Sequence, residues 1–279
     1  MPADSAPPAG DSAPTSGGRF RPRIARPLLL CAVPVLALFG VAAFAPLPFT
    51  IAEPGTTVNV LGSDRGEPVI TISGEKSRRT TGQLRMTTIA ATGPDASVDL
   101  ANVVDGWFAT DRAVLPRDSV YPTGDSTKEI QRYNTEQMRQ SQDAATEAAL
   151  RYLHKSPKDV RVTLRLADVG GPSAGLMFAL GIVDKLDGDG SGGDLTGGRK
   201  IAGTGTISPD GRVGPVGGVS LKTRAARRDG ATVFLVPRKE CGDAKAERPA
   251  GLRLVPLTTL GRAVADLRAL EEGRPVRGC

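Results

Sequence analysis

The sequence predicts a mixed α/β domain that follows a membrane-spanning helix and a segment of strands with one long helix. Three observations carry this prediction: strand and helix patterns alternate over residues 159–272, a charge-free apolar run covers residues 28–52, and a long helical pattern lies between them. With 279 residues the chain can bury one sizeable core or two modest ones. We predict four parts: a disordered basic cytoplasmic tail over 1–26, a transmembrane helix over 27–52, an extracytoplasmic strand and long-helix segment over 53–158, and the α/β domain over 159–279.

Composition excludes several classes of function. The net charge is +6, but the basic residues are spread through the chain apart from one cluster near the N-terminus, and no basic patch is interleaved with aromatic residues. We therefore expect no nucleic-acid partner. His154 is the single histidine, and the three cysteines have no zinc spacing. These counts exclude most metal sites and most Ser-His-Asp arrangements, so we expect no metal and no cofactor.

The N-terminal part has the pattern of a membrane anchor. Residues 1–18 are mostly Pro, Ala, Ser and Gly, four arginines follow, and no charge occurs between Arg26 and Glu53. A bilayer core needs about 20 apolar residues in a helix, so this run can span it. The positive-inside bias places the N-terminus in the cytoplasm and the rest outside the cell membrane. The alternative is a signal peptide cleaved after Ala45, but the long apolar run and Pro46 favour a retained anchor.

The predicted position of the chain outside the membrane decides which cysteines can form a disulfide. Outside the membrane a disulfide can form, and Cys241 and Cys279 are the two thiols there. A bond between them would tie the C-terminal tail to the body; two free thiols are the alternative. Cys31 lies within the apolar run and is expected to be a small buried hydrophobe.

Short strands and one long helix are expected before the α/β domain. Three segments rich in β-branched residues and bounded by Gly or Pro read as strands: TTVNVLG, PVITISG and GQLRMTTIAAT. Among these segments, residues 69–72 and 86–89 have the two clearest strand patterns. Ser126 to Glu129 has the pattern of a capping box, and no Gly or Pro follows until Pro157, which predicts a long helix ending near His154. Its apolar side contains Ile130, Tyr133, Met138, Ala145, Ala149 and Tyr152.

The later part of the chain alternates strands and helices. Alternating apolar and polar residues predict a strand over 160–169, and a Gly-Gly-Pro-Ser turn then leads into a helix that ends near Asp187. A hairpin is expected to turn at residues 209–211. The remaining elements are a helix (VSLKTRAARRDG), two buried strands (ATVFLVP and LRLVPL) and a last helix (TTLGRAVADLRALEE).

Ser173 lies in the Gly-Gly-Pro-Ser turn and is a candidate nucleophile. The spacing Gly171-x-Ser173-x-Gly175, between a strand and a helix, matches the nucleophile elbow of α/β-hydrolases. That family requires a histidine later in the chain, and none follows Ser173. A serine hydroxyl needs a base, so a neutral lysine is the expected substitute. A helix N-cap is the alternative role for this serine.

Lys222 is the candidate base. It lies at the start of a predicted helix, after a Gly-Pro-Val-Gly-Gly turn and beside Val219 and Leu221. A helix N-terminus disfavours positive charge and so lowers the pKa of a lysine. The other lysines after Ser173 lie on the serine's own helix, in a Gly-rich loop or in a charged segment. A solvated surface lysine is the alternative.

Together these two motifs resemble the proteolytic domain of Lon-type serine peptidases. The first block is GPSAG around Ser173, and the resemblance covers about residues 159–260. The second block consists of Thr204-Gly205-Thr206-Ile207, Gly211, Val213, Pro215-Val216-Gly217-Gly218 and Lys222. The resemblance implies a Lon-like fold and a serine endopeptidase of protein or peptide substrates. It also implies that Ser173 is the nucleophile, Lys222 the general base and Thr204 a hydrogen-bond partner of the lysine. Since Lon-type domains often form rings, a homo-oligomer is expected.

The anchored arrangement resembles the membrane-bound Lon-like proteases that carry a PDZ module, but two features depart from the family. The few residues between His154 and Val160 leave no room for such a module, so substrate capture is expected to differ. The acidic residue often found three positions before the serine is Gly170 here, with Asp168 further back.

ATP is not expected to take part in the reaction. Lys222-Thr223 resembles the end of a P-loop, but the glycine required before the lysine is Leu221. The prediction is therefore an ATP-independent, membrane-anchored Ser-Lys endopeptidase. The alternative is a non-catalytic, membrane-tethered interaction module on the same fold.

Overall fold

A computed structural model describes residues 25–122, 126–166 and 169–279, with side chains from Cys31 onward. The chain divides into two compact units, Met1–Ala45 and Pro46–Cys279. The first unit contains helix α1, Ala25–Phe44. Among the helices of the described residues, none is long and apolar enough to cross a membrane.

The predicted helix over 27–52 is wrong at its C-terminal end. Helix α1 ends at Phe44, and strand β1 (Phe49–Asn59) takes over the last part of the apolar run. Pro46 and Pro48 lie between the two elements, and proline removes the amide that a continuing helix would need. Cys31 is exposed rather than buried.

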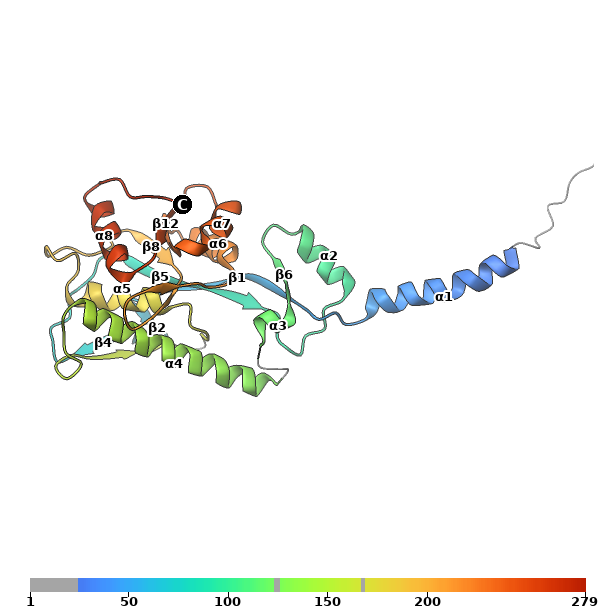
Figure 1. The fold of residues 1–279 in the computed structure, drawn as a ribbon, viewed down its shortest axis with the longest axis horizontal. Helices are drawn as coiled ribbons and strands as arrows, with labels where there is room; N and C mark the ends of the chain where they lie inside the picture. The colour runs from blue at the N-terminus through green and yellow to red at the C-terminus, as the bar shows by residue number, and fades with distance from the viewer. Residues whose placement is uncertain (1–24, 123–125, 167–168) are drawn as a thin grey trace, which may run out of the picture. The chain divides into compact units, whose positions relative to one another are not determined.

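A six-stranded mixed sheet is the centre of the second unit (Figure 1). Its order is β12-β11-β8-β5-β1-β6. The strands other than β1 are β5 (Gln83–Ala91), β6 (Ala113–Pro116), β8 (Lys200–Gly203), β11 (Val233–Pro237) and β12 (Arg253–Leu257). Strands β12, β11, β8 and β5 pair in parallel, whereas β1 is antiparallel to both β5 and β6.

The six-stranded sheet contains strands from both predicted parts, the strand and long-helix segment over 53–158 and the α/β domain over 159–279. Strand β5 pairs with β8 through Leu84 opposite Ile201 and Met86 opposite Gly203. The two firmest strand candidates, residues 69–72 and 86–89, coincide closely with β4 (Ile70–Ser73) and with part of β5, but these strands do not pair with each other. Strand β4 pairs instead with β7 (Arg161–Leu164) in a separate two-stranded sheet.

Helices cover both faces of the six-stranded sheet. On one face lies α5 (Gly175–Leu186), packed against α4 (Thr127–Tyr152) and α8 (Leu260–Glu271). On the other face lie α6 (Val219–Arg228) and α7 (Cys241–Ala246), and Figure 1 shows α4 and α6 on opposite sides of β1 and β5. Along β11 the side chains alternate between two cores, with Val233 and Leu235 in one and Phe234 and Val236 in the other. The predicted α/β architecture is therefore present.

The long helix α4 matches its prediction closely. Its N-cap is Ser126, but the expected capping box is absent because the Ser126 side chain makes no cap hydrogen bond. At its C-terminal end, the N–H of His154 donates to Arg151 O and the N–H of Lys155 to Leu150 O. His154 has φ +56 and is exposed, so the single histidine serves a Schellman-type helix end.

Several short elements complete the second unit. The predicted hairpin forms from β9 (Thr206–Ile207) and β10 (Val213–Gly214). The sequence patterns did not predict β2 (Ser63–Asp64), β3 (Glu67–Pro68), α2 (Leu100–Phe108), α3 (Arg117–Val120), the 3-10 helix η1 (Arg238–Glu240) or α7. These elements are too short to show a helical or strand period.

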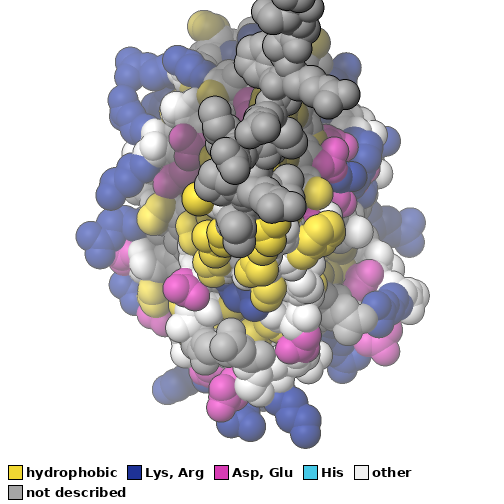
Figure 2. Space-filling model, turned by 90° about the vertical axis from the view of Figure 1, so that its right-hand side faces the viewer, with side chains coloured by type: hydrophobic (Ala, Val, Ile, Leu, Met, Phe, Trp, Pro, Cys, Tyr) yellow, Lys and Arg dark blue, Asp and Glu magenta, His cyan; other side chains and the backbone are white. Residues whose placement is uncertain are grey.

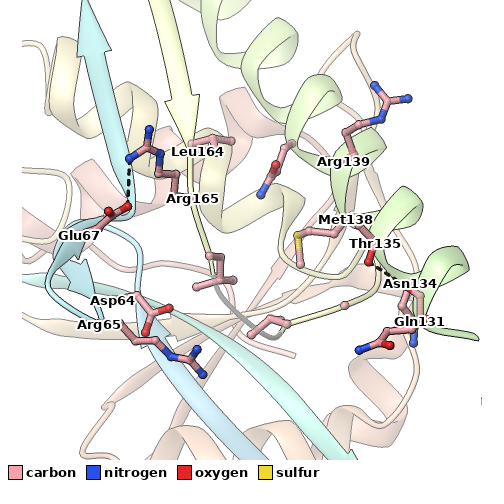
Figure 3. A pocket seen from close by; sticks show the side chains of 14 residues that line it. Asp64, Arg65, Glu67, Gln131, Asn134, Thr135, Met138, Arg139, Leu164 and Arg165 are labelled. Carbon is pink, nitrogen blue, oxygen red and sulfur yellow. Dashed lines mark hydrogen bonds and ion pairs between the residues drawn. The ribbon is translucent and has the colours of Figure 1, made fainter. Parts of the chain in front are cut away.

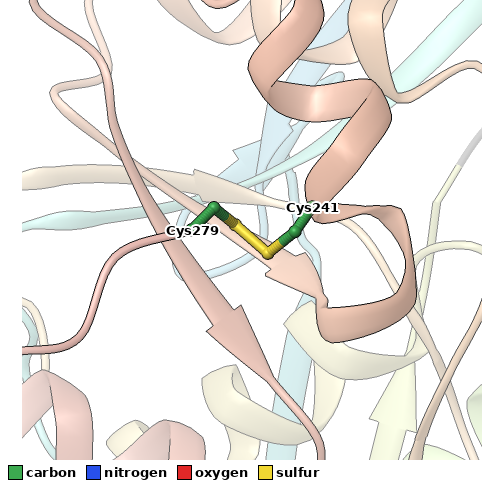
Figure 4. Close-up of a disulfide and its surroundings, with 2 residues drawn as sticks. All are labelled: Cys241 and Cys279. Carbon is green, nitrogen blue, oxygen red and sulfur yellow. A yellow bond between two sulfur atoms is a disulfide. The ribbon is translucent and has the colours of Figure 1, made fainter.

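A disulfide joins Cys241 to Cys279 (Figure 4). Cys241 begins α7, and Cys279 follows α8, so the bond holds the residues after α8 against the core that lies beneath α6. The sequence left open whether these two thiols are bonded or free, and the structure has them bonded.

Candidate active site

The two candidate residues lie at the carboxyl end of strand β8. Thr204 and Gly205 follow this strand directly, and the helices α5 and α6, from opposite faces of the sheet, both begin here. The N–H of Leu176 in the first turn of α5 donates to Gly205 O at 3.1 Å. Sites in α/β folds commonly form outside the carboxyl ends of parallel strands, where helix N-termini and loops converge.

Backbone hydrogen bonds from two directions hold the Ser173 loop. From the β8 side, the N–H of Gly205 donates to Ser173 O at 2.9 Å. From α4, the Ser141 hydroxyl donates to Pro172 O at 3.0 Å, and Asn134 O accepts the N–H of Gly171 at 3.2 Å. The serine itself is half-buried. Because Ala174 is the N-cap of α5, Ser173 does not take the capping role.

Lys222 is buried beside this loop. It is 4% exposed and is the one fully buried lysine in the described part of the chain. Its Nζ donates to Thr204 Oγ1 at 3.2 Å, and that hydroxyl donates to Ser173 O at 3.3 Å. Two hydrogen-bond lengths therefore bound the separation between the amine and the serine's own carbonyl oxygen. The expected hydrogen bond between Thr204 and Lys222 is present.

Burial lowers the pKa of Lys222 from 10.5 to about 8. The cause is desolvation: the charged amine loses water, and no carboxylate among the described residues pairs with it. The sequence pattern pointed to the helix N-terminus, but burial beside Val219 and Leu221 is the dominant physical reason. A substantial fraction of such an amine is neutral slightly above physiological pH.

The two turns that carry the site require glycine. Gly171, two residues before Ser173, has φ +87, and Gly218, the N-cap of α6, has φ +66. Residues with a Cβ rarely adopt these conformations. A Cβ at Gly218 would also lie 2.9 Å from Ile89 Cγ2, so the glycine lets α6 approach β5 closely. This approach brings Lys222 beneath the loop.

Free backbone donors lie next to the serine. The N–H groups of Ser173 and Ala174 donate no hydrogen bond to any described residue. They precede α5 directly, where the helix dipole favours negative charge. Such donors can stabilise an oxyanion that forms on a carbonyl attacked by Ser173.

Two pockets flank the segment before Ser173, and Val169 and Gly170 line both. The smaller pocket has a volume of about 540 Å³ and also contacts residues 54–56 of β1, residues 88–90 of β5 and Arg228. The larger has a volume of about 1020 Å³ and lies between α4 and β7. Figure 3 shows its polar lining, with Arg165 paired to Glu67 at 3.0 Å and Arg139 pointing from α4.

The sequence patterns did not identify Ser141 or the strand residues that line the smaller pocket. Ser141 had a detectable signal, because it interrupts the apolar side of the long helix between Met138 and Ala145. A hydroxyl at such a position needs a partner when buried. Asp168, considered as a supporting acid, lies outside the described residues.

The fold and the site together define a mixed α/β domain in which a buried amine lies beside a serine at a helix start. Residues 127–255, a range that includes Ser173, Thr204 and Lys222, match the family described as the Lon protease (S16) C-terminal proteolytic domain. A Lon protease from Rhizobium meliloti (strain 1021) is 33% identical over 98 residues. That alignment covers 34% of this chain and 11% of the Rhizobium protein, so the chain corresponds to about a tenth of its relative. The similarity supports a serine peptidase.

Proposed function

We propose that this chain is a serine endopeptidase in which Ser173 is the nucleophile and Lys222 the general base. The observation that carries the proposal is the buried Lys222 amine, with its pKa lowered to about 8, linked through Thr204 to the backbone of Ser173. A general base works best when its pKa lies near the working pH. Thr204 is a positioning residue in this proposal, because it holds the amine beside the serine loop.

The reaction needs only these residues and water. Neutral Lys222 takes the hydroxyl proton as Ser173 Oγ bonds to the peptide carbonyl carbon, and negative charge develops on the carbonyl oxygen. The N–H groups of Ser173 and Ala174 stabilise this charge. When the C–N bond breaks, the Lys222 ammonium returns its proton to the leaving amine. Water, deprotonated by Lys222, then attacks the ester carbon on Ser173. The bond between that carbon and Ser173 Oγ breaks, the Lys222 ammonium returns the proton to Oγ, and the product leaves with a new carboxyl group.

The proposed substrates are proteins or peptides, and the chemical step consumes no ATP. Pockets on both sides of Gly170 provide room for substrate residues on either side of the scissile bond. The smaller pocket is lined mainly by uncharged strand residues, so it suits an uncharged substrate side chain.

The test compares Ser173→Ala and Lys222→Ala with the control variants Ser119→Ala and Lys200→Met, which change exposed residues of the same types. We expect both site variants to lose cleavage of unfolded protein while the controls retain it. Wild type, but not Ser173→Ala, should also react with a fluorophosphonate probe. Cleavage retained by both site variants would overturn the dyad. Absence of cleavage and of labelling in folded wild type would favour the alternative of a non-catalytic interaction module.

We also propose that the apolar run of helix α1, residues 27–44, attaches the chain to the cell membrane, with the proteolytic part outside the cytoplasm. In support, large apolar side chains of α1 are exposed, among them Val33, Leu36, Leu38, Phe39 and Phe44. Exposing this much apolar surface to water is costly. Cell fractionation tests the idea: the chain should remain in the membrane fraction at high salt and high pH. Recovery in the soluble fraction would contradict it.

Self-association is part of the same proposal and follows from the likeness to Lon-type domains. Analytical ultracentrifugation in detergent should show a species heavier than one chain of 29.0 kDa. A single monomeric species over the full range of protein concentrations would exclude it.

A further inference from the structure

Helix α2 presents an apolar stripe to solvent. Leu100, Val104, Trp107 and Phe108 are 44%, 43%, 75% and 86% exposed. Their spacing places them on one side of the helix, while Val103 and Gly106 are buried on the other. Figure 2 views the right-hand side of Figure 1, where hydrophobic side chains, those of α1 included, are exposed among Lys and Arg side chains. Exposed apolar surface of this kind marks interaction sites.

This stripe ends at a groove, which we call the α2 groove. Its volume is about 690 Å³. One wall is residues 107–110; the other is formed by three arginines of α6 and by residues 246–249. The charged lining residues are Arg224, Arg227, Arg228, Glu247 and Arg248. Arg224 pairs with Glu247 at 3.1 Å and Arg228 with Asp229 at 2.9 Å, which leaves Arg227 and Arg248 as groove arginines without an ion pair to a described residue.

The α2 groove and the pocket that contains Gly170 share one lining residue. Arg228 lines both the α2 groove and the pocket that contains Gly170. Its Nη2 donates to Gly55 O at 2.7 Å and its Nη1 to Pro54 O at 3.3 Å, so its side chain also holds the wall of that pocket. The same helix α6 buries Lys222 on its inner side and presents the arginines on its outer side.

We propose that the α2 groove binds an extended segment of the polypeptide substrate, with aromatic or large aliphatic side chains against Trp107 and Phe108 and acidic side chains against the arginines. This inference rests on the proposed peptidase function and extends it to substrate selection. The chemistry is that of an unfolded, apolar and acidic stretch, because a folded protein rarely exposes such a sequence. A concave groove that shares Arg228 with the pocket containing Gly170 favours an extended polypeptide over a flat lipid surface.

Trp107 is the single tryptophan of the chain, so its fluorescence reports on the groove directly. The probe is a tryptophan-free 20-residue peptide containing Phe, Leu and Glu, added to the full chain carrying Ser173→Ala. We expect the Trp107 emission to shift to shorter wavelength and to saturate. Two matched peptides, with Phe and Leu replaced by Ser or with Glu replaced by Lys, should bind at least about tenfold more weakly, as expected for losing one buried apolar side chain.

Kinetics on the active chain provide the second measurement. The variant Val104→Ser/Phe108→Ser should raise KM for the long peptide about tenfold with kcat unchanged, because it removes binding that ground state and transition state share. Cleavage of a peptide too short to reach from Ser173 to α2 should not change. The control is Tyr133→Ser, which removes an exposed aromatic residue of α4 and should leave both reactions as in wild type. Circular dichroism establishes that each variant is folded.

The outcomes separate this inference from the peptidase proposal. Loss of activity in Ser173→Ala with no response of Trp107 to the peptide would overturn the groove and leave the peptidase intact. A saturable response in a chain that cleaves nothing would support the groove alone. If the Trp107 emission shifts with anionic phospholipid vesicles but not with the peptide, the proposal is overturned in favour of a membrane surface. If the emission shifts with protein concentration alone, it is overturned in favour of a second copy of the chain.

Discussion

At the scale of single residues, burial of the Lys222 amine lowers its pKa, as a general base requires, but also destabilises the folded state. A lysine whose pKa falls from 10.5 to about 8 on folding destabilises the folded state at pH 7 by about 3 kcal/mol, because the folded chain binds its proton less tightly than the unfolded chain. The stability of the wild type should therefore rise as the pH increases from about 8 to 10.5. The proposed role of Lys222 as general base would account for a residue with this cost.

The first prediction concerns the pH dependence of Lys222. Below pH 8 the neutral fraction of the amine changes tenfold per pH unit, so kcat/KM should rise with a slope of one and level off above about pH 8. Lys222→Met should abolish cleavage yet increase the free energy of unfolding at pH 7 by about 2 kcal/mol, after about 1 kcal/mol is subtracted for the lost hydrogen bond to Thr204.

Denaturant unfolding at two pH values checks this prediction. The gain in stability should be largest at pH 7 and nearly absent above pH 10.5, where the unfolded amine is neutral as well. Lys200→Met serves as the control, since Lys200 is exposed. A rate profile that is flat from pH 6 to pH 9 would contradict the assignment of Lys222 as the base.

The second prediction concerns Asp184, a buried carboxylate of α5. Burial is the main cause that raises its pKa from 3.8 to about 6, and nearby Asp194 adds to it. Oδ1 accepts the N–H of Leu195 at 2.8 Å, while Oδ2 has no partner among the described residues. The folded state favours the protonated form, so stability is lost as the pH rises from 3.8 to about 6.

Asp184→Asn should remove this cost. At pH 7.5 the free energy of unfolding should increase by about 2 kcal/mol, and at pH 3.5 it should be nearly unchanged. Thermal melts at both pH values measure the difference, with Asp143→Asn on the exposed side of α4 as the control. Equal effects of Asp184→Asn at the two pH values would contradict the raised pKa.

The sequence could nominate Ser173, Lys222 and Thr204, because short glycine-rich motifs with the right residue types are visible locally. It could not show that Lys222 is buried, since burial results from the sheet beneath α6 and from the approach allowed by Gly218. The interrupted apolar side of the long helix could mark Ser141 as unusual, but the sequence could not show its partner Pro172, which is 31 positions away. Contacts between distant segments leave little trace in a single sequence.

At the scale of elements, α4 acts as a support for the serine loop. Its two contacts come from Asn134 and Ser141, nearly two turns apart, so a rigid helix fixes both ends of the Gly171–Pro172 segment. A loop held by a helix keeps the nucleophile more precisely placed than a loop held by other loops.

The third prediction tests this support. Ser141→Ala removes one hydrogen bond to the loop and should lower kcat about tenfold, while the free energy of unfolding falls by only about 1 kcal/mol. KM should change little, because Ser141 does not line either pocket. The control is Thr146→Ala, which removes a hydroxyl elsewhere on α4. A change in stability with unaltered kcat would assign Ser141 a structural role only.

Long periodic elements could be predicted, and pairing could not. The helices α4, α5, α6 and α8 lie where their patterns place them, because a buried face repeats within the element. The partner of β5 is β8, which lies more than 100 residues later, and no local signal specifies that choice. The sequence did not predict helix α2, because this helix has only nine residues and its solvent-facing side is apolar, so it lacks the alternation of apolar and polar faces that marks a surface helix.

At the scale of the whole molecule, the disulfide ties the end of the chain to the body. It closes a loop of 38 residues, for which the chain-entropy model gives a stabilisation of about 4 kcal/mol. Neither cysteine is a hydrogen-bond partner of Ser173, Thr204 or Lys222 among the described residues, so we expect the bond to stabilise the fold without taking part in the proposed chemistry.

The fourth prediction follows. Cys279→Ser should lower the free energy of unfolding by about 2–4 kcal/mol and leave kcat unchanged at temperatures where the variant remains folded. Thermal melts with and without a thiol reductant provide the measurement: the reductant should destabilise wild type and have no effect on the variant. Cys31→Ser, which changes the thiol outside the bond, is the control. A wild type insensitive to reductant would show that the bond does not stabilise the body.

The strand order has a consequence for how the protein is made. Strand β5 lies between β1 and β8, so a chain emerging from the ribosome has half a sheet and an unpaired edge until more than a hundred further residues have been translated. Lys222 comes later still. In the proposed mechanism, a partly synthesised chain therefore has the nucleophile but not the base, and we expect it to cleave nothing before its own folding is nearly complete.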